Sequence, residues 1–267
     1  MMSWQVDPEI TAMLRVEKIL QLMQKREHQQ AIIEAEELLE QTPNHAKGLF
    51  LLAEALLERG EMESAVATYK QHLSIAEPIP CSLVGLGIAR FGMCDFTGCA
   101  ENCRQAIDLA PDRAEAYYFL GLCLEREPGG RAEAAQCLVT AQRLAPENYP
   151  LPLELTDEEW QALLQQALAQ MPEQLQSFWS EVPVVMEELP PTEELLLNTP
   201  TIAPTVCGLA RGVTPTTSPR RKKRPQALAL FTGNLARCPS RQNVVQELAR
   251  TLEHEALTWQ QAHKTTD

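Results

Sequence analysis

Apolar and polar residues follow a helical period along the first 150 residues. Apolar side chains recur at spacings of three and four, as on one face of an amphipathic helix. The helical segments come in pairs, joined by polar or glycine-containing turns such as Arg59-Gly60-Glu61 and Pro128-Gly129-Gly130. Each pair ends on a proline, which cannot continue a helix. These prolines are Pro43, Pro78, Pro111 and Pro146. The pattern predicts four helical hairpins.

The hairpins repeat with a period of 34 residues. Sliding the chain against itself by 34 residues aligns Ala12, Ala46, Pro80 and Ala114, so the units start near these positions. One such hairpin cannot bury its apolar stripe alone, and several must stack. We therefore predict a mainly α protein, in which residues 1–150 form an α-solenoid of four hairpins.

Small residues recur at fixed places within each unit, where they let paired helices approach closely. These residues resemble the tetratricopeptide repeat family over about residues 10–148. That family has a small eighth residue, alanine at the twentieth position and proline at the thirty-second. The small eighth residue is present in three units, as Ala53, Gly87 and Gly121. Ala31 and Ala65 occupy the twentieth position, while Ile19 in the first unit and Cys99 in the third depart from the pattern.

The resemblance implies a concave groove lined by the first helix of each unit, with positions five and nine pointing into it. Glu54 stands at one of these eight positions, and the other seven are apolar or aromatic. The seven are Val16, Leu20, Phe50, Val84, Ile88, Tyr118 and Leu122. We expect a protein or peptide partner that offers an apolar segment or an amphipathic helix, which makes the chain a protein-interaction scaffold or adaptor. Two alternatives stay open: the residues are simple core, or the C-terminal part of the chain fills the groove.

The second half of the chain follows a different pattern. The period stops after Pro146, and a stretch with two prolines at 148–154 marks the boundary between residues 1–150 and 151–267. Thr156 and Glu159 form a capping-box pattern for a helix reaching about Gln170. A second helix is expected from Pro172 to about Ser180, and a long one from Ser240 to about Lys264. The apolar runs 182–189 and 227–231 read as strands. These elements predict a small α+β domain.

This order of elements, ending in Thr251-Leu-Glu-His-Glu255, resembles the minimal zincin-like metallopeptidase family of bacteria over about residues 155–260. The resemblance implies a His-Glu-x-x-His helix, in which two imidazoles hold zinc and the glutamate acts as general base. His254 and Glu255 match, but Thr258 stands where the second histidine is expected. We therefore expect a pseudoenzyme without cofactor or catalysis. The alternative is a zinc metallopeptidase with a non-standard ligand set, whose repeats recruit substrate. His263 and Asp267 are expected to be solvated rather than to replace the missing ligand.

Charge argues against binding to nucleic acid. The chain has 36 acidic and 23 basic residues, a formal net charge of −13. The run Arg220-Arg-Lys-Lys-Arg224 is the local exception, and we interpret it as a solvated loop, with contact to an acidic segment of the same chain as an alternative. A scaffold that binds RNA or DNA through this run is a third hypothesis.

Membrane insertion and export are also not indicated. The N-terminal residues show no basic and apolar leader pattern, and no stretch of about 18 apolar residues occurs. The eight cysteines form no CxxC pair, so reduced thiols in the cytoplasm are expected. We interpret the closest three, Cys94, Cys99 and Cys103, as small core residues rather than metal ligands.

Overall fold

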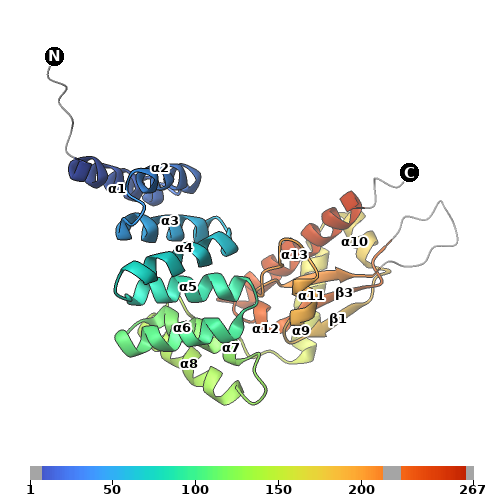
Figure 1. Cartoon of the computed structure of the whole chain (residues 1–267). Helices are drawn as coiled ribbons and strands as arrows, with labels where there is room; N and C mark the ends of the chain where they lie inside the picture. Colours follow the sequence, from blue (N-terminus) through green and yellow to red (C-terminus); the bar gives the residue numbers. More distant parts are fainter. Residues whose placement is uncertain (1–7, 213–223, 263–267) are drawn as a thin grey trace. The chain divides into compact units, whose positions relative to one another are not determined.

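The computed structural model describes residues 8–212 and 224–262, and the chain forms two compact units, residues 1–149 and 150–267. Within the described part of the first unit, eight helices follow one another as stacked hairpins (Figure 1). They are α1 (Pro8–Gln24), α2 (His28–Gln41), α3 (Ala46–Glu58), α4 (Met62–Ile75), α5 (Pro80–Gly92), α6 (Phe96–Leu109), α7 (Ala114–Leu124) and α8 (Arg131–Leu144). The predicted helical solenoid is confirmed. Three first helices begin at Ala46, Pro80 and Ala114, whereas α1 begins earlier than Ala12, at Pro8.

The turn inside each hairpin passes through the left-handed region of backbone conformation. The φ angles are 60° at Arg26, 78° at Gly60, 62° at Cys94 and 82° at Gly129. The first three positions keep the 34-residue spacing, and Gly129 lies one residue later because the last hairpin has one extra residue in its turn. Glycine adopts this conformation without steric cost, whereas Arg26 and Cys94 adopt it at some cost.

The first helices α1, α3, α5 and α7 contact one another in sequence and form one layer of the solenoid. Small residues keep the two helices of a hairpin close together. A Cβ atom at Gly87 would lie 3.3 Å from Sγ of Cys103, and one at Gly121 would lie 3.0 Å from the Leu138 side chain. The predicted role of the small eighth residue therefore holds in these two units.

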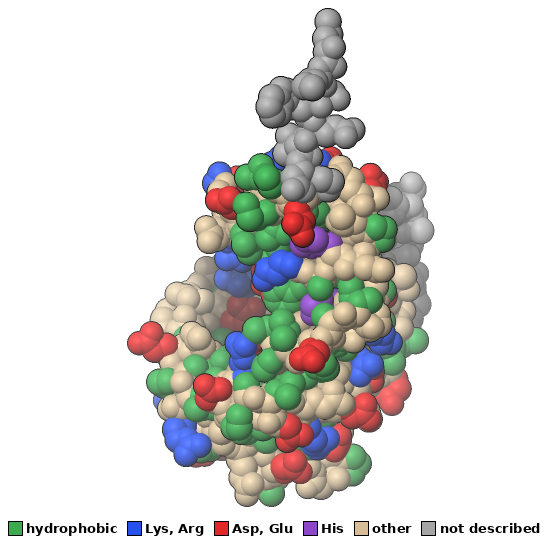
Figure 2. Space-filling model, turned by 60° about the vertical axis from the view of Figure 1, so that its left-hand side comes forward, with side chains coloured by type: hydrophobic (Ala, Val, Ile, Leu, Met, Phe, Trp, Pro, Cys, Tyr) green, Lys and Arg blue, Asp and Glu red, His purple; other side chains and the backbone are tan. Residues whose placement is uncertain are grey.

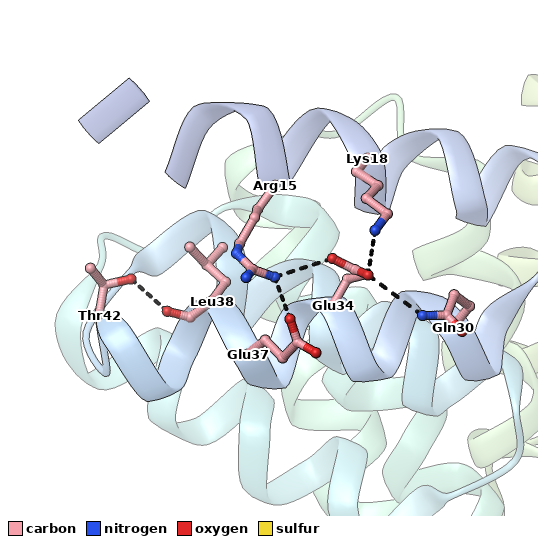
Figure 3. Close-up of polar contacts among 7 residues, drawn as sticks. All are labelled: Arg15, Lys18, Gln30, Glu34, Glu37, Leu38 and Thr42. Carbon is pink, nitrogen blue, oxygen red and sulfur yellow. Dashed lines mark hydrogen bonds and ion pairs between the residues drawn. The ribbon is translucent and has the colours of Figure 1, made fainter. Parts of the chain in front are cut away.

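A group of ion pairs joins the first hairpin (Figure 3). The Glu34 carboxylate on α2 accepts hydrogen bonds from Nζ of Lys18 at 2.5 Å and from Nη1 of Arg15 at 3.2 Å, both on α1. Arg15 also binds Glu37 at 2.6 Å. Glu34 is 6% exposed, and its two cations hold the pKa of its carboxyl below the ordinary value.

The second unit is a three-stranded sheet with helices. Its elements are α9 (Asp157–Ala169), α10 (Glu173–Trp179), β1 (Val184–Glu187), α11 (Thr192–Leu196), β2 (Gly208–Arg211), β3 (Ala227–Phe231), α12 (Thr232–Leu235) and α13 (Arg241–Ala262). The strand order is β1-β3-β2, with β1 parallel and β2 antiparallel to the central strand. One hydrophobic core holds residues of α9, α10, β3 and α13 together. Across this core, Nε1 of Trp179 donates to the Leu252 carbonyl at 3.2 Å.

The capping box at α9 is confirmed, because Thr156 and Glu159 exchange side-chain to backbone hydrogen bonds of 3.3 and 2.9 Å. Three short elements were not predicted: α11, β2 and α12. Arg211 at the end of β2 holds two of the neighbouring elements together. Its guanidinium binds Glu187 of β1 at 2.9 Å and Glu194 of α11 at 2.7 Å.

Among the described helices, none combines the length and the apolar character that crossing a bilayer requires.

Candidate functional site

The residues predicted to line the groove fall into two groups in the structure. Leu20 is 39% exposed, and Val16, Phe50, Ile88 and Tyr118 are half-buried. The remaining two belong to the hydrophobic core: Val84 is 1% exposed and Leu122 is 2% exposed. They have almost no surface to offer a ligand, because neighbouring side chains cover these two first-helix positions.

We define the first-helix surface as the accessible residues at repeat positions two, five and nine of α1, α3, α5 and α7. Its members are Met13, Val16, Leu20, Lys47, Phe50, Glu54, Cys81, Ile88, Glu115 and Tyr118. The surface is therefore mixed rather than wholly apolar. Figure 2 shows one face of the molecule, on which hydrophobic side chains gather in patches between charged ones.

Phe50 lies between a cation and an imidazole. Nζ of Lys47 is 4.8 Å from the centre of the Phe50 ring, and the ring of His72 is 5.8 Å away at 52°. His72 is buried, and its Nδ1 lies 3.0 Å from the Ala46 carbonyl oxygen at the start of α3. These contacts fix the position of Phe50 on α3.

Glu54 is held by a side chain from the second helix of its own hairpin. The hydroxyl of Tyr69 on α4, which is fully buried, donates a short hydrogen bond to the Glu54 carboxylate. Burial raises the pKa of Glu54 above the ordinary 4.5, and repulsion from Glu115 and Glu58 adds to this rise. Burial and the Glu54 charge also raise the pKa of Tyr69, so its hydroxyl stays protonated and remains a donor.

A second acidic and aromatic group lies at the last repeat. Tyr118 of α7 stacks on Tyr149, with ring centres 4.7 Å apart and ring planes at 30°. Burial raises the pKa of Glu115 on the same helix, while Arg113 opposes this rise. The pKa of Tyr149 is raised to about 12, first by burial and then by the charge of Glu115. The Arg113 guanidinium also donates to Sγ of Cys81 on α5.

Tyr69, Arg113, Glu115 and Tyr149 were not singled out from the sequence. Glu115 could have been found, because it occupies the second position of its unit, as Lys47 and Cys81 do in theirs. Tyr149 follows the last hairpin and has no counterpart in the repeat period, so no sequence pattern indicated its stacking.

The residues that match a zinc-binding helix do not form a metal site in the described part of the chain. His254 and Thr258 are exposed on α13, whereas Glu255 is half-buried. Oε2 of Glu255 accepts a hydrogen bond of 2.8 Å from the backbone N–H of Ala210 on β2, and burial raises its pKa. Within residues 8–212 and 224–262, no group of three or more His, Cys, Asp or Glu residues could hold a metal ion. His263, Lys264 and Asp267 lie outside the described residues.

The basic run is also mostly outside the described residues, which include only Arg224 of the five cations. Nη1 of Arg224 forms an ion pair with Glu181 at 2.9 Å.

The cysteine trio does not converge on one point. Cys99 and Cys103 are buried with their sulfur atoms 3.9 Å apart, whereas Cys94 lies in the left-handed turn before α6.

Comparison with known proteins supports the resemblance of the repeat. Residues 17–78 match the tetratricopeptide repeat family model. This part of the N-terminal unit is therefore similar to tetratricopeptide repeats, as the sequence resemblance implied.

Known proteins are similar to part of this chain in sequence or structure. A cytochrome c-type biogenesis protein, CycH of Rhizobium meliloti (strain 1021), is 31% identical over 143 residues, which cover 52% of this chain. The chain spans about a third of that relative's length, since 35% of the relative is covered. Among solved structures, MamA from Desulfovibrio magneticus RS-1 is 21% identical with a TM-score of 0.47, covering 52% of this chain and 76% of that one. YrrB, described as a tetratricopeptide protein with an unusual peptide-binding site, is 17% identical with a TM-score of 0.45, covering 49% and 68%.

Proposed function

We propose that the chain is an adaptor whose first-helix surface binds a segment of a partner protein that is largely apolar. The observation that carries this proposal is the set of accessible apolar and aromatic side chains on successive first helices, Val16, Leu20, Phe50, Ile88 and Tyr118. Side chains on one layer of a stacked repeat are spaced along a single line, which suits an extended peptide or an amphipathic helix.

Affinity capture with paired variants tests this proposal. The variants Phe50→Ala and Tyr118→Ala shorten two aromatic side chains of the surface, and we expect each to lower partner recovery by about tenfold. Val139→Ala is the matched control, because Val139 is 51% exposed on α8, a second helix. Thermal melting of all three variants verifies that they are folded. Equal partner recovery by Phe50→Ala, Tyr118→Ala and the wild type would overturn the proposal. If the chain itself fills the groove, we expect no partner to be recovered with any of these proteins, which would also contradict the proposal.

We further propose that the C-terminal unit is a zincin-like domain that has lost zinc and catalysis. Two observations support this: His254 is exposed without a second imidazole one turn later, and the Glu255 carboxylate is used to bind the β2 backbone. A catalytic zinc needs three protein ligands and an open position. Metal analysis of the purified chain is the test. Near-stoichiometric zinc that is lost in His254→Ala would favour the metallopeptidase alternative instead.

We also propose a cytoplasmic location, because the eight cysteines are all free and suit a reducing compartment. Fractionation of cells that express the full-length chain tests this, and recovery outside the cytoplasm would contradict it.

A further inference from the structure

The charges on the first-helix surface are not balanced. After burial, repulsion from Glu115 of α7 and Glu58 of α3 raises the pKa of Glu54, and Glu58 also raises the pKa of Glu115. Among the cations, Lys47 opposes the rise at Glu54 and Arg113 opposes the rise at Glu115. Within the described part of the chain, none of these three carboxylates forms an ion pair within 4.0 Å. Glu34 in the first hairpin is different, because it binds two cations of the same chain.

This arrangement makes the charged forms of Glu54 and Glu115 unfavourable in the folded protein. Both are half-buried, and a carboxylate taken partly out of water without a cation is unfavourable. The Tyr69 hydroxyl offsets part of this cost at Glu54, yet burial remains the largest influence on its pKa. A ligand that brings a positive charge would offset the remaining free-energy cost of burying these two carboxylates.

Aromatic rings lie beside these carboxylates. Tyr118 is three residues from Glu115 on α7 and stacks on Tyr149, whose pKa responds to the Glu115 charge. Phe50 is one helical turn from Glu54 on α3 and already holds the Lys47 ammonium over its ring. An aromatic face next to a carboxylate is a favourable place for an ammonium or guanidinium group.

A bare metal ion does not fit this place. The acidic residues described here form no group of three that could coordinate a metal. An ammonium or guanidinium on a flexible side chain needs no convergent ligand set, since it can pair with one carboxylate and contact a ring at the same time.

We propose that the partner segment carries lysine or arginine residues that pair with Glu54, one turn from Phe50, and with Glu115, beside Tyr118 and Tyr149, while its apolar neighbours contact Phe50 and Ile88. The ligand is thus a basic amphipathic peptide rather than a purely apolar one. This inference rests on the proposed function, because it concerns the same surface.

Selection from a phage-displayed library of random 12-residue peptides, with the full-length chain as bait, tests the inference. We expect the selected peptides to combine apolar residues with an excess of Lys and Arg over Asp and Glu. The double variant Glu54→Gln/Glu115→Gln keeps the shape and the hydrogen bond from Tyr69, and we expect it to bind the selected peptides about tenfold more weakly. Glu101→Gln, an exposed change on α6, is the control and should bind as the wild type does.

The outcomes separate the two proposals. Selected peptides that are apolar or acidic, or that bind the double variant as tightly as the wild type, would overturn the basic-peptide inference but leave peptide binding intact. Failure of the folded wild-type chain to select any peptide would overturn both.

Discussion

The Tyr69 hydroxyl reaches the Glu54 carboxylate only because residue 85 has no side chain. A Cβ atom at Gly85 on α5 would lie 2.2 Å from Oη and 2.4 Å from Cζ of Tyr69, far inside van der Waals contact. Tyr69 is fully buried, so its ring cannot move aside without disturbing the core. The placement of one acidic residue on the first-helix surface thus depends on a glycine in the next repeat.

We expect Gly85→Ala to lower the free energy of unfolding by about 1–3 kcal/mol, because overpacking forces the Tyr69 ring to shift. Gly92→Ala on the same helix is the control. The three atoms nearest to a Cβ there belong to the flexible Met62 side chain, from 3.0 Å, and the change should be neutral within about 1 kcal/mol. Urea denaturation measures both variants. Equal stability of Gly85→Ala and Gly92→Ala would show that Tyr69 has room to move.

The first hairpin is expected to lose stability when Glu34 is removed. In Glu34→Ala, Arg15 and Lys18 both lose an acceptor, and we expect a loss of about 1 kcal/mol at pH 7. The pKa of Glu34 is lowered in the folded state, so its contribution is present above its ordinary pKa of 4.5 and is lost as the pH falls through the folded value. Glu36→Ala, an exposed change on the same helix, is the control. The difference between these variants in denaturation experiments should therefore shrink from pH 7 to pH 3.

Much of the N-terminal unit could be predicted from the sequence because the repeat applies the same physical constraints four times. Prolines, left-handed turns and small residues recur with the helices, so α3, α5 and α7 begin where the period places them. The hydrogen bond between Tyr69 and Glu54 could not be predicted in this way. It joins positions of two different helices and depends on the space left by Gly85, which only the packing reveals.

In the C-terminal unit, the sequence indicated the long helices and the two apolar strands, but not β2. Gly208–Arg211 is a four-residue edge strand, too short to show a period of two. Its position explains the role of Glu255, since the carboxylate binds an N–H of this strand. The motif on α13 was visible in the sequence, whereas the structural use of its glutamate was not.

Glu255 and His254 are expected to respond differently to substitution. Glu255→Ala leaves the Ala210 N–H without its acceptor, and we expect the free energy of unfolding to fall by about 1–2 kcal/mol. His254→Ala changes an exposed side chain and should stay within about 0.5 kcal/mol of the wild type. Guanidinium denaturation with and without a zinc chelator measures both effects. A loss of stability in His254→Ala that the chelator reproduces in the wild type would indicate a bound metal and contradict the prediction.

The carboxylates of the first-helix surface should cost the free protein stability at neutral pH. The folded-state pKa values of Glu54 and Glu115 are raised above 4.5, so the folded state binds protons more tightly than the unfolded state does. Stability from these groups is then greatest below about pH 4.5 and falls as the pH rises through the folded pKa values. Glu54→Gln/Glu115→Gln removes both charges, so we expect it to be more stable than the wild type at pH 7, with a smaller gain at pH 4. Thermal or urea unfolding at the two pH values measures the difference, with Glu101→Gln as the control.

A double variant that is less stable at pH 7 would mean that the two charges already have sufficient partners within the chain, and the case for a cationic ligand would lose its physical basis. Greater stability combined with weaker peptide binding would instead show that these two carboxylates serve the ligand at the expense of the fold.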